Sequence, residues 1–256
     1  MKVALLQMNV ARRDAAANIA AAERLMQRAG EADLYVLPEM WATGFDVHPD
    51  ESTFSAGVQG LAWMREQATG RGCSVAGSLP VLNEERKPVN RFFGCIAGHA
   101  EATYDKRHPF APGGEAAAYE AGQQMANFLL AGMTIRPLIC YDLRFPVFSR
   151  CRRGDYDVLL YVANWPAVRM EAWRILLRAR AIENQCYVIG VNRTGQDGRL
   201  LYDGGSMVVD PTGQVLLCMD EAEDAAVVEL QPEHVATVRR NFPVLNDADD
   251  FALQLK

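Results

Sequence analysis

The stretch KVALLQMNVARRDAAANIAAAERLMQRAGEADLYVLPEM, residues 2–40, sets a pattern that recurs along the chain. Its apolar run over 2–10 predicts a strand, and the alanines and leucines of 15–32 favour a helix. A second apolar run over 33–40 predicts another strand. A strand, a helix and a strand in this order indicate an α/β fold in which helices cover a sheet.

A predicted helix over 58–72 is followed by three strand-like runs with no helix between them. These runs cover 73–82, 90–98 and 100–106. Consecutive strands without a crossover helix are expected to form a meander. The chain therefore predicts mixed sheets rather than purely parallel ones, and two stacked sheets are expected.

The second half repeats the alternation. Helices are expected over 146–153 and 171–185. Strands are expected over 127–130, 133–140, 156–165, 186–192, 205–210, 214–220 and 225–230. Pro137 conflicts with this pattern, because proline cannot donate to a sheet ladder and its strand then needs a bulge or a free edge. No low-complexity linker interrupts the chain, so residues 1–256 are expected to form a single domain.

Composition excludes several classes of protein. Half of the 256 residues are apolar, which is enough for a substantial buried core. Lys and Arg total 26 against 32 Asp and Glu, so the net charge is −6 and nucleic acid is a poor partner. No run of about 18 uncharged apolar residues occurs, which argues against a membrane-spanning helix. The N-terminal apolar run precedes its arginines and lacks an A-x-A site, so it indicates a strand rather than a signal peptide.

Six cysteines are spread along the chain without a C-x-x-C pair or the dense spacing of a disulfide framework. This usage predicts free thiols in a cytoplasmic protein. Four lie in apolar runs, where cysteine packs as a small hydrophobic residue: Cys73, Cys95, Cys186 and Cys218. Cys140 differs. In LICYDLRFPVFSR, residues 138–150, it ends an apolar run and is followed at once by a turn dense with charge, so it is placed for chemistry.

Three polar side chains each follow a strand-like run directly: Glu39 in PEMWATGF, Lys106 in YDKRHPF and Cys140 in ICYDLRF. Because ligands collect at the carboxyl ends of strands in α/β sheets, these side chains are candidates for one site. A thiol in water has a pKa near 8.5 and needs a cation nearby or a base in contact to attack. A carboxylate can take its proton while an ammonium stabilises an oxyanion, and these roles together predict acyl transfer.

Histidine is the usual base for a cysteine nucleophile, so its placement matters. Of the four histidines, only His108 lies in a candidate segment. It stands two residues from Lys106 and would share that residue's face on an extended run. A Cys140–His108 dyad and a structural role for His108 both remain open. No H-E-x-x-H, His-x-His or paired-cysteine motif supplies a metal site.

The ordered motifs PEM at 38–40, YDKRHPF at 104–110 and CYDLRFP at 140–146 resemble the nitrilase, or carbon-nitrogen hydrolase, superfamily. The resemblance spans nearly the whole chain. The later runs YVANWP, RARAIENQCYVIGVNRTG and DGGSMVVDPTGQV are similar to the omega-amidase branch. The resemblance implies a four-layer α-β-β-α sandwich with two mixed sheets covered by helices, and a homodimer.

The same resemblance implies a Glu-Lys-Cys triad. Glu39 is then the general base, Lys106 the oxyanion stabiliser and Cys140 the nucleophile, with no metal or organic cofactor. Relatives place a second glutamate ahead of an A-G pair, which matches Glu115, with Glu120 the less favoured choice. This glutamate is expected to position Lys106.

Further positions follow from the resemblance. The backbone N–H of Tyr141 is expected as a second oxyanion donor. Pro109 stands where relatives carry leucine, so the lysine loop is expected to follow a different path. Trp165 matches a pocket position but equally suits core packing, and Phe45 is expected in the pocket. Arg144 either pairs with a substrate carboxylate or forms a buried structural ion pair with an aspartate, Asp142 or Asp155.

The implied reaction is hydrolysis of a small-molecule amide to ammonia and an acid through a cysteine thioester. The omega-amidase branch implies 2-oxoglutaramate or 2-oxosuccinamate as the substrate. Alternatives in the same family are an amidase for deaminated glutathione, an N-carbamoyl amino acid hydrolase and a nitrilase. From another class, a non-catalytic thiol sensor or binding module would use Cys140 alone, with no need for Glu39 and Lys106.

Overall fold

The computed structural model describes residues 1–254 and contains two six-stranded mixed sheets. The first sheet has the order β14 (Asp224–Glu229), β1 (Lys2–Gln7), β2 (Leu34–Val36), β3 (Ser74–Leu82), β4 (Pro88–Ile96) and β5 (Ala102–Asp105). The second has the order β13 (Val215–Cys218), β12 (Met207–Val209), β9 (Tyr187–Asn192), β8 (Val158–Ala163), β7 (Met133–Ile139) and β6 (Phe128–Leu130). In each sheet three parallel strands are flanked by antiparallel ones, as the sequence predicts.

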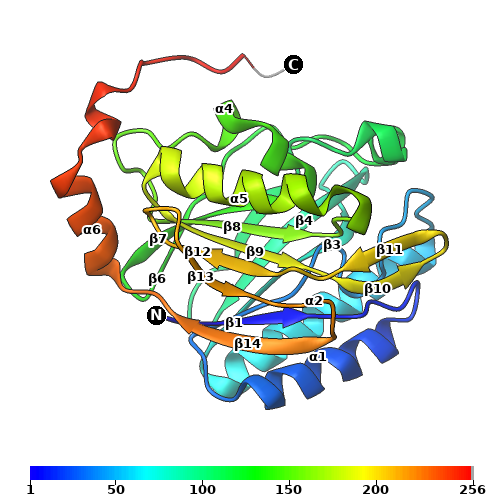
Figure 1. Ribbon diagram of the computed structural model, residues 1–256. Helices are drawn as coiled ribbons and strands as arrows, with labels where there is room; N and C mark the ends of the chain where they lie inside the picture. Colours follow the sequence, from blue (N-terminus) through cyan, green and yellow to red (C-terminus); the bar gives the residue numbers. More distant parts are fainter. Residues whose placement is uncertain (255–256) are drawn as a thin grey trace.

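Helices cover the outer face of each sheet (Figure 1). Helices α1 (Ala15–Ala29) and α2 (Glu51–Arg71) pack on the first sheet through side chains such as Met26 and Trp63. Helix α5 (Met170–Asn184) packs Trp173 and Leu177 on the second, beside the short α4 (Pro146–Ser149). The apolar inner faces of the two sheets form the central core. This arrangement confirms the predicted four-layer α-β-β-α sandwich.

Several short helices lie in the loops between strands or come after the last strand in the sequence. These are η1 (Ala111–Gly113), α3 (Glu115–Ala118), η2 (Cys140–Arg144), η3 (Ala167–Arg169), α6 (Pro232–Asn241) and η4 (Val244–Asp247). A small hairpin of β10 (Thr194–Asp197) and β11 (Leu200–Asp203) stands apart from both sheets. The sequence did not predict α6 or the hairpin.

Two predicted helix boundaries are wrong. Helix α2 begins at Glu51 rather than 58, because the Asp50 carboxylate and the Thr53 hydroxyl form a capping box. The helix expected over 146–153 ends at Ser149, since Arg150 is extended with ψ of 126°. The next residue donates its N–H to the side chain of Asn184 instead of continuing the helix.

The conflict at Pro137 is resolved by a free edge. Strand β7 pairs with β8 through Pro137 on one side, but β6 pairs only with the segment from Met133 to Ile135 on the other. Beyond Ile135, β7 no longer pairs with β6, so Pro137 does not need to donate a hydrogen bond on that side. Among the packing cysteines, Cys73, Cys95 and Cys186 are buried, whereas Cys218 is exposed, contrary to expectation.

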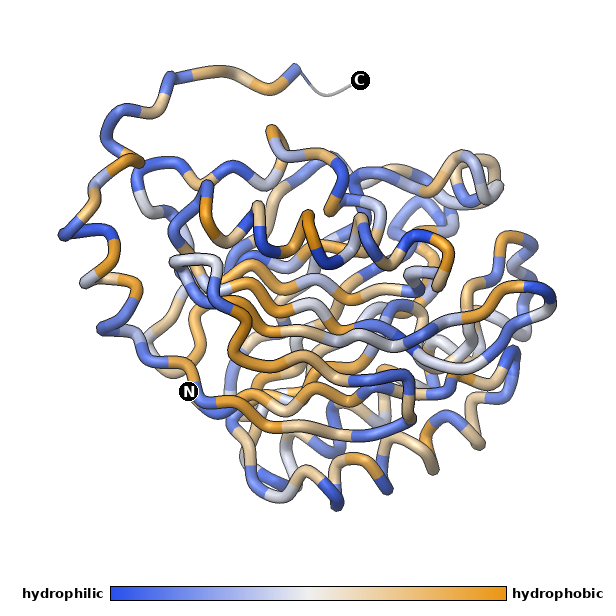
Figure 2. Tube along the Cα trace, in the orientation of Figure 1, coloured by the Kyte–Doolittle hydropathy of each residue, from blue (hydrophilic) through white to orange (hydrophobic). Residues whose placement is uncertain are grey.

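Figure 2 shows hydrophobic residues gathered along the strands of both sheets and hydrophilic ones in the connecting loops. The helices alternate between the two, as expected for elements with one face on a sheet. Within residues 1–254, no helix has both the length and the apolar character needed to cross a bilayer.

Candidate active site

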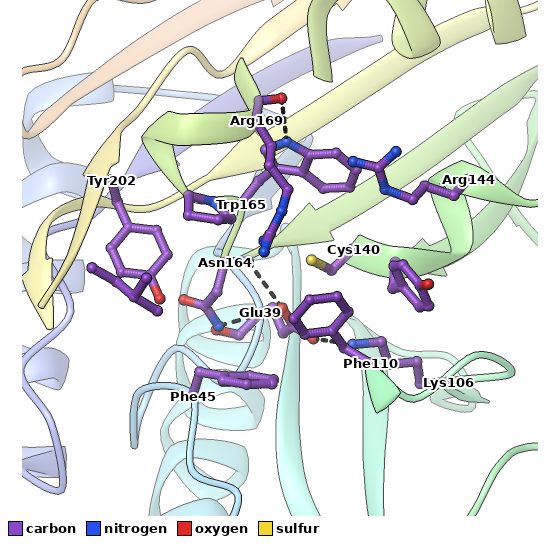
Figure 3. A pocket seen from close by; sticks show the side chains of 13 residues that line it. Glu39, Phe45, Lys106, Phe110, Cys140, Arg144, Asn164, Trp165, Arg169 and Tyr202 are labelled. Carbon is purple, nitrogen blue, oxygen red and sulfur yellow. Dashed lines mark hydrogen bonds and ion pairs between the residues drawn. The ribbon is translucent and has the colours of Figure 1, made fainter. Parts of the chain in front are cut away.

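The carboxyl ends of three strands meet at one cavity. Glu39 follows β2, Lys106 follows β5 and Cys140 follows β7, so the cavity draws on both sheets. Figure 3 shows the three side chains directed toward one another. Lys106 Nζ lies 2.7 Å from Glu39 Oε1. The convergence expected from the strand ends is therefore present.

The turn that carries Cys140 has an unusual backbone. Its φ is 45°, in the left-handed region that side chains with a Cβ rarely adopt. The carboxylate of Asp142 stabilises this turn by accepting the N–H of Ile139 at 2.9 Å. The chain thereby leaves β7 sharply, enters η2 and presents the thiol to the cavity. Strain of this kind collects at functional sites.

Glu39 is fully buried, and polar groups hold both of its carboxylate oxygens. Oε1 accepts hydrogen bonds from Lys106 Nζ and from Asn90 Nδ2, the latter at 2.8 Å. Oε2 accepts the backbone N–H of Asn164 at 2.9 Å. A buried charge is tolerated only when it is paired in this way. The network fixes the carboxylate in orientation.

A second carboxylate lies on the other side of the lysine. Glu115 Oε2 is 2.7 Å from Lys106 Nζ and accepts the Phe110 N–H at 2.6 Å, while Oε1 accepts Asn90 Nδ2 at 2.9 Å. Glu120 is exposed and pairs with the Lys87 ammonium. Of the two candidates, the structure places Glu115 beside the lysine.

This arrangement sets the charge state of the lysine. Burial alone would lower the pKa of Lys106, but the carboxylates of Glu115 and Glu39 outweigh it and raise the pKa. Burial also raises the pKa of Glu115, against the opposing charge of the lysine. Lys106 is therefore an ammonium at neutral pH, with two carboxylates holding it in place.

The surroundings of Cys140 disfavour its charged form, in contrast to those of Lys106. Burial raises the pKa of Cys140 well above its usual value, and the nearby charge of Glu39 adds to this, while Lys106 only partly opposes it. The thiol is thus protonated at neutral pH. A protonated nucleophile needs a base in contact at the moment of attack, rather than a preformed thiolate.

His108 lies outside this cavity. Its Nδ1 is 2.8 Å from Asp142 Oδ1, its backbone N–H donates to the same oxygen at 3.0 Å, and its ring stacks on Phe145. The hydroxyl of Tyr104 donates to the other oxygen of Asp142. These contacts tie the lysine loop to the cysteine turn, which favours the structural reading of His108. The loop containing Pro109 still delivers Lys106 to the cavity.

The predicted pocket residues Phe45, Arg144 and Trp165 all line the cavity, as does Tyr141, which is expected to act through its backbone N–H. Trp165 lies at the boundary between cavity and core, because it also packs on Trp173. The remaining lining residues besides the triad are Phe110, Asn164, Pro166, Arg169, Leu200 and Tyr202.

The buried ion pair expected for Arg144 is wrong. Its side chain is exposed, and its guanidinium lies 4.9 Å from the ring centroid of Trp165. Asp155 pairs instead with Arg136 at 2.7 Å, and Asp142 is occupied by His108. Arg144 is therefore a pocket residue without an acidic partner among residues 1–254.

The family model described as carbon-nitrogen hydrolase matches residues 2–240, a range that includes Glu39, Lys106 and Cys140. The chain belongs to the carbon-nitrogen hydrolase family. The resemblance inferred from three sequence motifs is thereby confirmed.

This carbon-nitrogen hydrolase is similar to known amidases over nearly its whole length. The omega-amidase YafV of Escherichia coli strain K12 is 40% identical over 255 residues, which cover 99% of this chain and 98% of the relative. The 2-oxoglutaramate amidase of Bacillus subtilis strain 168 is 34% identical, with 96% of each chain covered. A crystal structure of a CN-hydrolase superfamily protein from Xanthomonas campestris, with an arsenic adduct in its active site, matches with a TM-score of 0.92, 37% identity and 99% of both chains covered.

Two polar residues of this hydrolase's site gave no signal in the sequence. Asn90 lies near the start of β4, next to Arg91, rather than at a strand end, so its position did not mark it as functional. Arg169 ends η3, three residues after Pro166 and away from any strand end. In the part of the chain that the structure describes, no group of three or more His, Cys, Asp or Glu side chains is arranged to hold a metal ion.

Proposed function

We propose that this carbon-nitrogen hydrolase is an omega-amidase, which hydrolyses the terminal amide of a small keto-acid monoamide such as 2-oxoglutaramate or 2-oxosuccinamate. The products are ammonia and the dicarboxylic acid. The observation that carries the proposal is the buried Glu39–Lys106 pair beside a protonated Cys140 thiol in one cavity. The names of the relatives support the substrate class.

In the first half-reaction, Cys140 Sγ attacks the amide carbonyl carbon as Glu39 accepts the thiol proton. Lys106 Nζ and the backbone N–H of Tyr141 stabilise the oxyanion of the tetrahedral intermediate. Glu39 then gives its proton to the amide nitrogen, the C–N bond breaks and ammonia leaves. The acyl group remains on sulfur as a thioester.

In the second half-reaction, Glu39 takes a proton from water as the water oxygen attacks the thioester carbon. The same two donors stabilise the second oxyanion. Collapse of this intermediate breaks the C–S bond, releases the acid and returns the proton to sulfur. The cycle consumes one amide and one water. Glu115 and Asn90 take no part in bond changes but hold Lys106 and Glu39 in place.

The test is ammonia release from 2-oxoglutaramate. The wild-type protein is expected to release ammonia, and Cys140→Ala is expected to abolish it. The competing substrates are deaminated glutathione, an N-carbamoyl amino acid and a nitrile. Because cleavage of deaminated glutathione releases a dipeptide rather than ammonia, the disappearance of each substrate is measured as well, and kcat/KM across this panel is expected to be highest for the keto-acid monoamide. A silent thiol sensor would release no ammonia from any of them, which would refute the proposal.

We also propose that the chain forms a single domain. We further propose that it assembles as a homodimer through α4, η3 and α5. Large apolar side chains are exposed on these elements: Val147 at 53%, Val168 at 84%, Ile175 at 56% and Ile182 at 51%. Exposed apolar patches of this kind commonly mark interfaces. Light scattering is expected to give twice the chain mass, and Ile175→Asp is expected to give the monomer; a wild-type monomer would contradict the assembly.

A further inference from the structure

Three cations line the cavity: Lys106, Arg144 and Arg169. Lys106 is committed to the triad, because carboxylates hold its ammonium at 2.7 Å on two sides. Neither arginine guanidinium forms an ion pair with any carboxylate among residues 1–254. The cavity therefore contains two guanidinium groups that no acidic side chain of the described chain neutralises.

The two guanidiniums are directed differently (Figure 3). That of Arg144 lies alongside the indole of Trp165, 4.9 Å from the ring centroid. That of Arg169 extends into the cavity toward Cys140 and Asn164. An aromatic ring flanks it there, since its central carbon is 5.2 Å from the centroid of Phe110. Of the two, only Arg169 presents its donors toward the thiol.

The backbone of Arg169 is held in place. Its N–H donates to the carbonyl of Pro166 at 3.0 Å, and its carbonyl accepts the indole N–H of Trp165 at 2.8 Å. The Phe110 ring that flanks its guanidinium packs edge-on against Tyr141, and the Phe110 backbone N–H donates to Glu115. The backbone of Arg169 and the ring beside its guanidinium are therefore both positioned by contacts near the triad, as a recognition group requires.

Charge in the cavity points to an anionic ligand. The carboxylates of Glu39 and Glu115 face Lys106, and even when both are counted as charged the two arginines leave the site net positive. The whole chain carries −6, so this is a local reversal of sign. A positive cleft raises the local concentration of anions, and the planar fork of a guanidinium matches the two oxygens of a carboxylate.

We propose that Arg169 binds the carboxylate of the substrate and thereby selects monoamides of dicarboxylic acids over neutral amides. This inference rests on the proposed amidase function and adds the residue that determines its specificity. The amide carbon lies at Cys140 and the free carboxylate faces Arg169, at the opposite end of a short acyl chain. Phe110 and Trp165 flank the chain between them.

The experiment compares 2-oxoglutaramate with its methyl ester, which carries no charge at that end, by measuring ammonia release. Arg169→Gln is expected to lower kcat/KM for the acid roughly 10- to 100-fold, mostly through KM, which is the range for a lost hydrogen bond to a charged group. The ester is expected to change less than about threefold, since it never formed that bond. Arg169→Lys keeps the positive charge but lacks the planar fork of N–H donors. Its kcat/KM for the acid is expected to lie between that of the wild-type protein and that of Arg169→Gln.

Arg240→Gln, on an exposed arginine of α6, serves as the matched control and is expected to leave both substrates unchanged. Thermal unfolding of each variant separates misfolding from lost recognition. Equal losses on acid and ester in a folded Arg169→Gln would overturn the inference, as would a wild-type protein that uses both equally well. Neither result touches the proposed function, which fails only if the wild-type protein releases no ammonia from the acid.

Discussion

The residues at the floor and at the rim of the cavity differ in how their charged groups are paired. On the floor, Glu39, Lys106, Glu115 and Asn90 are buried and bound to one another in a closed network. On the rim, the guanidiniums of arginines lie against aromatic rings with no acidic partner in the described chain. The difference teaches that the proposed catalytic groups are oriented before substrate arrives, whereas the proposed recognition groups are left available for it.

The largest effect is expected when Glu39, the proposed general base on the floor of the cavity, is replaced. Glu39→Gln keeps the shape but cannot accept the thiol proton, so kcat should fall about 10³-fold, with KM nearly unchanged. Steady-state ammonia release measures both. Glu120→Gln, on the exposed glutamate, is the matched control and should retain full activity. A similar kcat in Glu39→Gln and wild type would show that another group takes the proton.

Asn90 tests whether the network beneath the triad positions it. Its side-chain amide donates to Glu39 and Glu115 together, so Asn90→Leu leaves two buried carboxylates short of a donor. We expect kcat to fall about 10- to 100-fold and the free energy of unfolding to fall by about 1–3 kcal/mol. Asn83→Leu, on a half-buried asparagine that donates to Glu120 away from the cavity, is the control. Loss of stability with an unchanged kcat would make Asn90 structural only.

The protonated thiol gives a prediction about pH. Because the pKa of Cys140 is raised by burial, its thiolate fraction stays small at neutral pH and grows only as pH climbs toward the raised value. Alkylation by iodoacetamide at pH 7 should be about tenfold slower at Cys140 than at the exposed Cys218, and the ratio should narrow as pH rises. Peptide mass spectrometry follows both sites in one sample. Faster, pH-independent labelling of Cys140 would mean a preformed thiolate.

The smallest effect is expected for Arg144, the arginine at the rim whose guanidinium lies alongside the indole of Trp165. Arg144→Gln removes a cation–π contact with Trp165 at an exposed site, which is worth about 0.5–1 kcal/mol. The charge of Arg144 lies at an exposed site, where an ion pair is worth about 0.2–1 kcal/mol, so KM should rise at most about fivefold, with kcat unchanged. A loss as large as that of Arg169→Gln would assign carboxylate binding to both arginines and remove the distinction between them.

The sequence predicted the floor better than the rim, for a physical reason. Glu39, Lys106 and Cys140 each interrupt an apolar strand pattern at its end, and the ends of these strands from the two packed sheets lie at the same edge of the sandwich. Asn90 lies inside a strand, and its contact with Glu39 depends on how β4 lies relative to β2 and β5. Pairing of that kind is a property of the assembled sheet, so no local pattern carries it.

The rim depends on loops whose paths are set by distant contacts. The hairpin that brings Tyr202 to the cavity is anchored by a hydrogen bond from Thr194 to the carbonyl of Met8, far away in sequence. The sequence leaves open whether Arg144 pairs with a substrate carboxylate or with Asp142 or Asp155, and in the structure His108 and Arg136 occupy these two aspartates. Competition for a partner is decided in three dimensions, and a single sequence does not rank the competitors.

The central claim is that Cys140 carries the acyl group between ammonia release and hydrolysis. Rapid acid quenching of the wild-type protein with excess 2-oxoglutaramate, followed by peptide mass spectrometry, tests it most directly. The account predicts an adduct on the Cys140 peptide with the mass of the substrate less that of ammonia, and none in Cys140→Ala. Ammonia release without this adduct at any quench time, with activity retained in Cys140→Ala, would contradict it.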